Sequence, residues 1–316
     1  GTYSVTATDE NGCSVSTEVT ITTPEELGIS ATWSDYTGFG VSCNGATNGS
    51  IDVTVTGGAG LITYVWSNGA DTEDLSDLGA GTYSVTATDE NGYSVSTEVV
   101  IIEADNMAIE SATADYTGFG VSCNGASDGG IYITVTGGTE NYTYLWSLDA
   151  EATANLSSLS MEELAVLAGA NGIDASEAAV AISNGLSMSG GSSLSGVPAG
   201  TYFVTVTDEN GCSVSTEVVI TEAEEMEISA TWSDYTGFGV SCNGATNGSI
   251  DVTVTGGSEN YTYVWSNGAD TEDLSNLGAG TYSVTATDEN GCSVSTEVVI
   301  TEAEEMEISA TWSDYT

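Results

Sequence analysis

The sequence of 316 residues contains no lysine, no arginine and no histidine, although it contains 47 aspartates and glutamates. Proteins that bind nucleic acid need cationic side chains to displace counterions from the phosphates, so this composition excludes nucleic acid as a partner. It equally excludes a basic patch that docks on anionic lipid. Without histidine the chain can form neither an imidazole zinc site nor a Ser-His-Asp triad.

Long apolar runs are also absent from the sequence. No stretch of 18 consecutive apolar residues occurs, so we expect no transmembrane helix and no direct membrane insertion in this segment. A formal charge of −47 without internal compensation repels itself, and salt or divalent cations would screen it. We therefore expect a saline or calcium-bearing extracellular setting. Because 40% of the residues are hydrophobic and recur at strand spacing, the chain should nevertheless fold.

What the sequence has in abundance is one repeated stretch, Gly81-Thr-Tyr-Ser-Val-Thr-Ala-Thr-Asp-Glu-Asn-Gly92. The stretch recurs at 1–12 and 280–291, and with two changes at 200–211. Its alternation predicts a half-buried β-strand, and Asp-Glu-Asn-Gly predicts a tight turn. A second alternating run, Ser94–Ile101, follows the turn, so each copy predicts a β-hairpin.

Turn residues divide the 80-residue unit around this hairpin into short strands. About seven strands, a Trp on the third and a Tyr early in the sixth are typical of an Ig-like β-sandwich. The lead-in Gly-x-Gly-Thr-Tyr suits a tyrosine corner. The expected strands, labelled as in an Ig domain, are A at 28–34 with a continuation at 40–42, B at 50–56, C at 63–67, E near 73–78, F at 82–88 and G at 94–102.

The spacing of the repeated stretch predicts tandem Ig-like domains in a head-to-tail array. Successive copies lie 80, 119 and 80 residues apart, so one repeat holds an insertion. The chain starts and stops inside a repeat, and we expect a longer array. The predicted domains are the end of repeat 1 at 1–24, repeat 2 at 25–104, repeat 3 at 105–223, repeat 4 at 224–303 and the start of repeat 5 at 304–316.

The insertion in repeat 3, at about 148–198, is predicted to be helical. Ser160-Met-Glu-Glu163 has the pattern of a capping box before an apolar run. Asp174-Ala-Ser-Glu177 begins a second run, which Asn184-Gly185 ends. We therefore expect two short helices, followed by a flexible return at 190–193.

The six cysteines occupy two recurring positions, one before strand B and one after the F–G turn. In a sandwich these two positions lie at opposite ends, roughly 30 Å apart at about 3.3 Å per strand residue. A disulfide needs Cα atoms within about 7 Å, so head-to-tail stacking favours bonds between neighbouring repeats. The favoured pairs are Cys43–Cys212 and Cys123–Cys292, with Cys13 and Cys242 left for other repeats; the alternative within-repeat pairs are Cys123–Cys212 and Cys242–Cys292.

Acidic residues at the expected junctions make calcium the one candidate cofactor. Clustered carboxylates and an Asn carbonyl are suitable ligands for Ca²⁺. The alternative is that the Asp-Glu-Asn sequence is only a turn and the glutamates are solvated. The candidate ligands are Glu222, Glu224, Glu225, Asp288, Glu289 and Asn290.

Aromatic residues recur in the loop between strands A and B, where they could grip a ligand or pack against the next repeat. Such residues more often pack. In repeat 3 Thr113 takes the place of the Trp. No catalytic constellation accompanies them, and near-identical repeats argue against a single active site, so we expect no enzyme. The candidate binding residues are Trp33, Tyr36, Phe39, Trp232, Tyr235 and Phe238.

Four motifs together resemble the SprB repeat, a family that builds giant cell-surface adhesins of gliding Bacteroidetes. The motifs are Val-Ser-Cys-Asn-Gly-Ala, Thr-Val-Thr-Gly-Gly, Tyr-Thr-Tyr-x-Trp-Ser-Asn-Gly and the Gly-Thr-Tyr hairpin. The resemblance covers nearly the whole sequence apart from 148–198, and it implies adhesion or gliding motility at the cell surface without identifying a ligand. The lack of basic residues and the insertion depart from the expected pattern.

The sequence therefore predicts a stalk or filament segment of a large extracellular adhesin, giving reach, stiffness and surface attachment. Its partners would be the neighbouring repeats of the same chain. Two other readings stay open. The repeated aromatic loops could form a polysaccharide-binding module that recognises surface glycans, or copies of the chain could assemble into a surface sheath or filament.

Overall fold

The computed structural model describes residues 1–147 and 188–312, and all regular secondary structure within these ranges is β. No helix in this part of the chain is long and apolar enough to cross a membrane. The chain divides into two compact units. The first contains Gly1–Ala108, Thr136–Tyr142 and Thr207–Val214, and the second contains Ile109–Val135, Thr143–Val206 and Ser215–Thr316.

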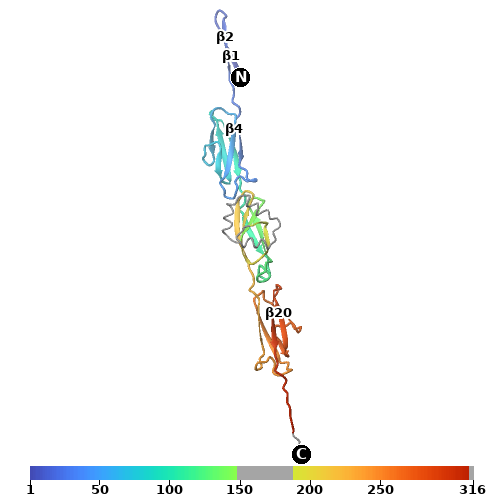
Figure 1. Ribbon diagram of the computed structural model, residues 1–316. Coiled ribbons are helices and arrows are strands. Elements are labelled where there is room, and N and C mark those ends of the chain that lie inside the picture. Colours follow the sequence, from blue (N-terminus) through green and yellow to red (C-terminus); the bar gives the residue numbers. More distant parts are fainter. Residues whose placement is uncertain (148–187, 313–316) are drawn as a thin grey trace, which may run out of the picture. The chain divides into compact units, whose positions relative to one another are not determined.

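Repeat 2 is a sandwich of two three-stranded antiparallel sheets (Figure 1, around β4). The sheets have the orders β3-β4-β6 and β5-β7-β8, which correspond to A-B-E and C-F-G. Every predicted strand is present within two residues, but there are six strands, and residues 40–42 form bends instead of continuing strand A. The strands are β3 (Gly28–Trp33), β4 (Gly49–Thr56), β5 (Thr63–Trp66), β6 (Leu75–Leu78), β7 (Gly81–Thr88) and β8 (Ser94–Ile101).

The core of repeat 2 lies between the two sheets and follows the alternation in the sequence. On β4 the side chains of Ile51 and Val53 are buried, whereas Val55, which was also expected to point inward, is half-buried. Trp66 on β5 is 2% exposed. At this degree of burial each large apolar side chain contributes about 1.5–3 kcal/mol to folding.

Strand β7 carries the tyrosine corner that the sequence predicts. Val85 and Ala87 point into the core, and the hydroxyl of Tyr83 donates a hydrogen bond to the carbonyl oxygen of Gly79 at 3.1 Å. The equivalent hydroxyls of Tyr202 and Tyr282 donate to the carbonyl oxygens of Pro198 and Gly278. This bond ties the beginning of strand F to the loop before it.

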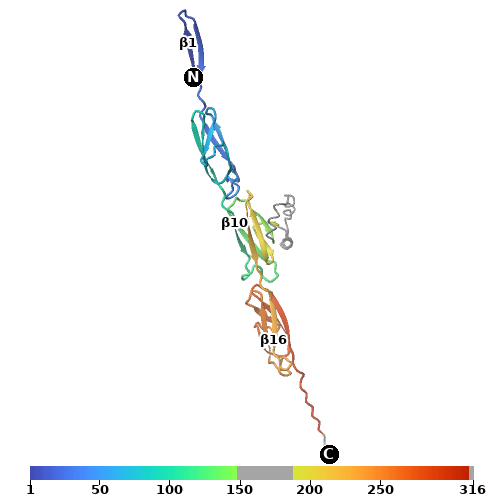
Figure 2. The same ribbon diagram turned by 90° about the vertical axis from the view of Figure 1, so that its left-hand side faces the viewer.

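Repeats 3 and 4 use the same two-sheet arrangement (Figure 2, β10 and β16). In repeat 3 the sheets are β13-β10-β9 and β12-β11-β14-β15, and in repeat 4 they are β16-β17-β19 and β18-β20-β21. The strands of repeat 3 are β9 (Ala108–Thr113), β10 (Gly129–Thr136), β11 (Thr143–Ser147), β12 (Met188–Gly190), β13 (Ser193–Val197), β14 (Gly200–Thr207) and β15 (Ser213–Ile220). Those of repeat 4 are β16 (Glu227–Trp232), β17 (Gly248–Thr255), β18 (Thr262–Trp265), β19 (Leu274–Leu277), β20 (Gly280–Thr287) and β21 (Ser293–Ile300).

The end of the predicted insertion belongs to the sandwich. Residues 148–187, which include both predicted helices, lie outside the described residues. Strand β12 pairs with β11, and β13 pairs with β10, where Leu194 lies opposite Ile131. Residues 188–190 and 193–197, which the expected insertion of about 148–198 includes, are therefore strands, and only residues 191–192 remain as a return between them. Leu194-Ser-Gly-Val197 resembles Leu75-Ser-Asp-Leu78 of β6, a likeness in the sequence that could have identified this strand.

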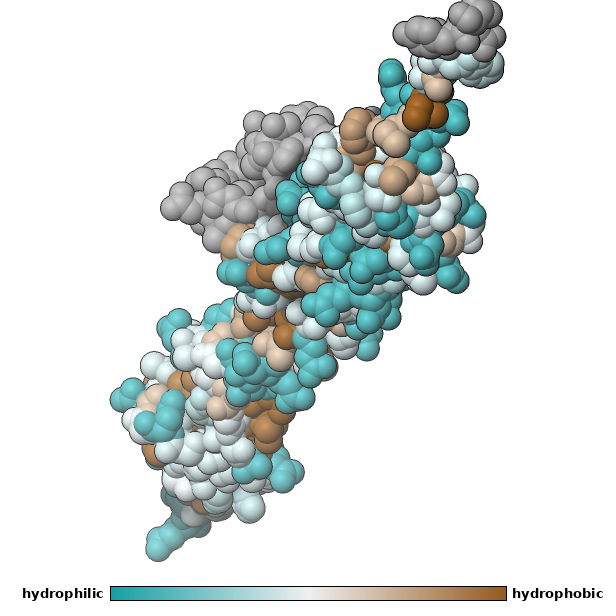
Figure 3. Space-filling model, turned by 90° about the horizontal axis from the view of Figure 1, so that it is seen from below, coloured by the Kyte–Doolittle hydropathy of each residue, from teal (hydrophilic) through white to brown (hydrophobic). Residues whose placement is uncertain are grey.

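The chain begins with the hairpin of β1 (Thr2–Thr8) and β2 (Ser14–Thr20), which has the register of β7 and β8. The apolar side chains of this hairpin are solvent-exposed, for example Val5 at 64% and Val15 at 71%. On the face of the molecule in Figure 3, hydrophilic and neutral residues surround small hydrophobic patches. The surface therefore agrees with the strongly acidic composition.

Candidate functional site

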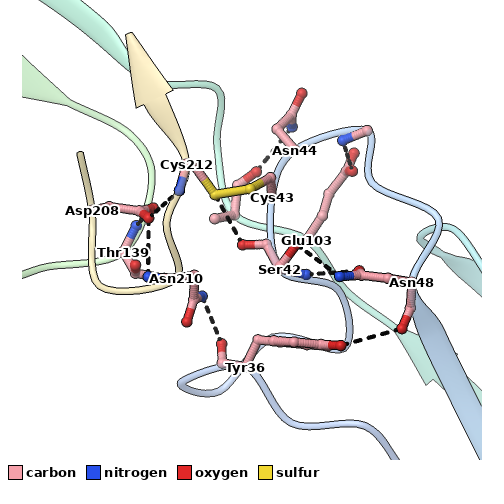
Figure 4. The surroundings of a disulfide bond; sticks show 12 residues. Tyr36, Ser42, Cys43, Asn44, Asn48, Glu103, Thr139, Asp208, Asn210 and Cys212 are labelled. Atoms are coloured by element: carbon pink, nitrogen blue, oxygen red, sulfur yellow. Dashed lines mark hydrogen bonds between the residues drawn. A yellow bond between two sulfur atoms is a disulfide. The ribbon is translucent and has the colours of Figure 1, made fainter. Parts of the chain in front are cut away.

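Two disulfides join residues of neighbouring repeats. The A–B loop, which connects β3 to β4 and their equivalents, contributes one cysteine, and the F–G turn, Asp-Glu-Asn-Gly-Cys between β14 and β15 and their equivalents, contributes the other. Cys43 bonds to Cys212 with the Cα atoms 5.7 Å apart (Figure 4). Cys123 bonds to Cys292 at the same Cα separation. These are the cross-repeat pairs, and neither within-repeat pair forms; Cys13 and Cys242 are free and exposed.

The A–B loop folds into a tight turn by its own hydrogen bonds. The backbone N–H of Tyr36 donates to the carbonyl oxygen of Phe39 at 2.7 Å, and the carboxylate of Asp35 accepts from the N–H of Gly38 at 2.6 Å. Both central residues have positive φ, 51° at Thr37 and 94° at Gly38. Glycine adopts this conformation freely, whereas a β-branched threonine is strained in it. Thr117 and Thr236 have the same conformation in the other loops.

A buried aspartate organises the F–G turns of repeats 2, 3 and 4. One carboxylate oxygen of Asp208 accepts from the N–H groups of Asn210 and Cys212 at 3.0 and 2.9 Å, and the other accepts from the N–H of Thr139 at 2.9 Å. Burial raises the pKa of Asp208, but these hydrogen bonds outweigh it, and the pKa lies below its ordinary value. Asp89 and Asp288 accept the equivalent bonds.

The F–G turn and the A–B loop also meet through an asparagine. The amide nitrogen of Asn210 donates to the carbonyl oxygen of Tyr36 at 3.1 Å, and its amide oxygen accepts from the hydroxyl of Thr37 at 3.2 Å. Asn290 makes the same two contacts with Tyr116 and Thr117. The threonine with positive φ thus takes part in the junction through its hydroxyl.

The linker between the repeats is fixed to the same A–B loop. The carboxylate of Glu103 accepts from the N–H of Gly45 at 2.6 Å, and the side chain of Asn44 donates to the carbonyl oxygen of Ala104 at 2.9 Å. Beyond it, the N–H of Gly138 donates to the carbonyl oxygen of Asp105 at 2.8 Å. Each junction therefore has two covalent connections, the main chain and the disulfide, with hydrogen bonds beside both. The equivalents of the first two bonds involve Glu222, Asn124 and Ala223, and Glu302, Asn243 and Ala303.

The candidate calcium ligands do not come together. No group of three or more metal-ligating side chains occurs in the described residues. The carboxylate of Glu222 accepts from Gly125, Asp288 from its own turn, and Glu289 from the side chain of Asn260. Asn290 contacts the A–B loop of repeat 3. The cluster expected from Glu222, Glu224, Glu225, Asp288, Glu289 and Asn290 is therefore not formed among the described residues. The side chains of Glu222, Asp288 and Glu289 instead accept hydrogen bonds from backbone or amide N–H groups.

The candidate aromatic residues divide into two groups. Trp33 and Trp232 are each 53% exposed, at the ends of β3 and β16. Tyr36 and Phe39, next to the F–G turn of repeat 3, are half-buried, whereas Tyr235 and Phe238 are 39% and 38% exposed. The tyrosine and the phenylalanine are thus better covered where a turn lies against their loop.

Sequence analysis missed several residues that form the junction, above all Asn44, Glu103 and Asp208. Asn44 belongs to an Asn-Gly pair that predicts a turn, Asp288 and Asn290 were candidate turn residues or calcium ligands, and no role was predicted for Glu103. One signal could have found them, because each residue recurs at the same place in successive repeats although a turn alone tolerates several residue types.

The SprB repeat family model matches residues 41–71, 121–150 and 240–270. Each match begins two residues before the cysteine of an A–B loop and extends to or beyond the third strand of that repeat. No curated protein sequence matches the chain.

Several solved structures are similar to this chain at low identity. A Ca²⁺-stabilized adhesin of an Antarctic bacterium is 18% identical over 95% of this chain and 80% of its own, with a TM-score of 0.36. A 1.5-MDa bacterial ice-binding adhesin is 15% identical over 87% and 97%, with a TM-score of 0.41. The N-terminal eight Ig domains of Down Syndrome Cell Adhesion Molecule are 12% identical, with a TM-score of 0.33; this chain aligns over 96% of its length and spans 43% of that structure.

Each of the three family matches contains the cysteine of an A–B loop. Cys43 and Cys123 form the cross-repeat disulfides, and Cys242 is unpaired. They also contain the Thr-Val-Thr-Gly-Gly motif, and the matches in repeats 3 and 4 contain Tyr-Thr-Tyr, where repeat 2 has Ile62-Thr-Tyr64. The chain therefore carries the SprB repeat at three places.

Proposed function

We propose that this chain is a structural segment of a large extracellular repeat adhesin, a stalk that holds an adhesive part away from the cell surface. The observation that carries the proposal is the junction, which occurs twice with the same partners: a cross-repeat disulfide, an Asn contact with the A–B loop, and a Glu contact from the linker. Two connections side by side resist bending and twisting more than a single linker does. A stalk needs this resistance.

The chemistry of the chain supports an extracellular location. Disulfides persist in oxidising compartments outside the cytoplasm. The charge of −47 keeps such a surface hydrated and self-repelling, and the absence of lysine and arginine removes every site at which trypsin-like proteases cleave. The proposal needs no bound calcium, because the disulfide and the hydrogen bonds described at each junction involve no cation.

Small-angle X-ray scattering of the whole chain tests the stalk. Under non-reducing conditions the scattering should fit a narrow range of molecular lengths. The variant C43S/C212S/C123S/C292S, which lacks both disulfides, should need a broader range. The matched control is C13S/C242S, which removes the two unpaired cysteines and should leave the scattering unchanged. If the chain scatters with the same broad distribution with and without the disulfides, the junctions do not stiffen it and the proposal is wrong.

A second function, glycan binding, is favoured by one observation. Trp33 and Trp232 remain 53% exposed, and indole rings on a hydrophilic surface are suitable for stacking on sugar rings. Retention of the chain on immobilised surface polysaccharide should fall when both tryptophans are changed to Ala. Repeat 3 has Thr113 at this position, so a change of Thr113 to Ala is the matched control and should leave retention unchanged. Unchanged retention, or no retention of the native chain, removes this function.

A further inference from the structure

The order of the four bonded cysteines along the chain interlocks the two disulfides. Cys123 lies between Cys43 and Cys212, and Cys212 lies between Cys123 and Cys292. Each bond therefore closes a loop that contains one end of the other bond. Bonds confined to single repeats would instead close separate loops, one after another along the chain.

From this connectivity we infer that the two disulfides limit the extension of the chain redundantly, so that either bond alone sets the same limit. The inference rests on the proposed function in that a stalk is a protein under tension. It concerns the distance to which the chain can be pulled, and it does not depend on how stiff the junctions are.

The limit follows from the shortest covalent path between the termini. Each disulfide joins residues 169 positions apart, so either bond removes 169 of the 315 residue-to-residue steps and leaves 146. With both bonds present the shortest path is still 146 steps, because the two loops overlap and their savings do not add. Only the loss of both bonds restores the full 315 steps.

Between the two disulfides the tension divides among parallel segments. A taut chain has one node at Cys43–Cys212 and another at Cys123–Cys292. Two segments of 80 steps join these nodes, from Cys43 to Cys123 and from Cys212 to Cys292, and they share the tension. The third segment, from Cys123 to Cys212, has 89 steps and stays slack. The 39 extra residues of repeat 3 therefore lie in the one segment that carries no tension at full extension.

This arrangement differs in a measurable way from disulfides in series. When disulfides follow one another in series, each bond excludes its own loop from the contour length, and the reduction of each bond adds that loop to the contour length. In the interlocked pair, reduction of the first bond leaves the maximum contour length unchanged, and reduction of the second bond adds all 169 steps to it. At about 3.3–3.6 Å per residue this is roughly 560–610 Å. The array would thus survive the loss of one bond without becoming longer.

Single-molecule force spectroscopy tests the inference on the whole chain, held through terminal peptide tags without thiol chemistry. All versions carry C13S/C242S, so that no other cysteine can pair. The parent, C43S/C212S and C123S/C292S should reach the same final contour length, and the version lacking all four cysteines should be longer by roughly 560–610 Å. A longer contour after loss of one pair alone contradicts the inference. Mass mapping under non-reducing conditions verifies the remaining bond in each version.

A second measurement needs no variant whose folding might be impaired. The parent is held extended at constant force, and a thiol reductant is added. Elongation should occur in a single step after a lag, because two bonds must break before any length is released. Two separate steps would show bonds in series and overturn the inference. The stalk proposal is tested separately by the scattering experiment. It fails if the chain with both disulfides intact occupies a broad range of molecular lengths.

Discussion

The A–B loops of repeats 2 and 4 have the same sequence from Asp35 to Gly45 and from Asp234 to Gly244, but different surroundings. The F–G turn of repeat 3 lies against the first loop, whereas in the described part of the chain no F–G turn lies against the second. The backbone turn is nevertheless kept, with positive φ at Thr37 and Thr236 and 2.7 Å from the N–H of Tyr36 or Tyr235 to the carbonyl of the phenylalanine. The return bond from the N–H of Phe39 to the carbonyl of Tyr36, at 3.1 Å, has no counterpart at Phe238.

What differs between the two loops is the coverage of their aromatic side chains. Tyr36 and Phe39 are half-buried, and Tyr235 and Phe238 belong to the exposed residues. The partner turn therefore adds burial, two hydrogen bonds and a disulfide to a loop that already has its shape. Because the loop is formed in advance, little conformational entropy is lost when the junction closes.

The largest expected effect comes from removing both disulfides. Loop-closure entropy for 169 residues predicts a loss of up to about 5 kcal/mol in the free energy of unfolding per independent loop. Calorimetry of C43S/C212S/C123S/C292S should therefore show a much lower melting temperature. Loss of Cys13 and Cys242 alone should not change it, and equal melting of all versions would show that the disulfides do not constrain the unfolded chain.

Next in size is Asp208→Asn, which removes an acceptor 5% exposed and bonded to three N–H groups. We expect a loss of about 1–3 kcal/mol in urea unfolding at pH 7. Because the pKa of Asp208 is lowered in the folded state, its contribution is present above the ordinary aspartate pKa and disappears as the pH falls through the folded value. The stability gap between the native chain and the variant should therefore narrow in acid; a constant gap would contradict the role of the charge.

A smaller loss of stability is expected when the asparagine of the F–G turn is changed, and it should differ between repeats 2 and 3. Asn210→Ala loses the contacts to Tyr36 and Thr37, which should cost about 0.5–1.5 kcal/mol. Asn91→Ala changes the same position in repeat 2, which has Tyr93 in place of the cysteine and no side-chain contact to an A–B loop among the described residues. Urea unfolding of both variants checks the difference, and equal losses would assign the asparagine to the turn alone.

The smallest expected effect distinguishes the two A–B loops directly. Thr236→Gly relieves a positive φ of 55° and should stabilise the chain by about 0.5 kcal/mol. Thr37→Gly relieves a similar strain but loses the hydroxyl that contacts Asn210, so its gain should be smaller or absent. Thermal melting of both variants measures the difference, and an equal gain would show that the hydroxyl contributes nothing at the junction.

The strands and the pairing of the cysteines could be predicted because both follow from alternation and from the length of a sandwich. Tyr83, Val85 and Ala87 reveal their strand through period-2 spacing, and the opposite ends of a sandwich separate its own cysteines. Strands β12 and β13 of repeat 3 were not predicted, because the expected insertion extended to about residue 198 and so included Leu194 and Val197. Period alone does not separate a short buried strand from a turn of helix.

The chemistry of the junction was harder to predict, because it depends on which partner lies next to each polar group in the folded chain. Glu222, Asp288 and Glu289 look alike in sequence whether they bind a cation or accept an N–H. Only the three-dimensional position of Gly125, Asn260 and the turn itself decides between the two. Burial of Asp208 likewise depends on Thr139, which lies 69 positions away.

The carboxylates of Asp35, Glu103 and Asp208 all accept hydrogen bonds from the main chain. A chain without basic side chains thus obtains its electropositive partners from the peptide bond, which every residue except proline supplies whatever its side chain. Ion pairs at a surface weaken in brine. These contacts are instead short-range hydrogen bonds, with 2.6–2.9 Å between the carboxylate oxygen and the amide nitrogen. The hydrogen bonds at the joints of this protein should therefore respond less to salinity than the charge repulsion across its acidic surface does.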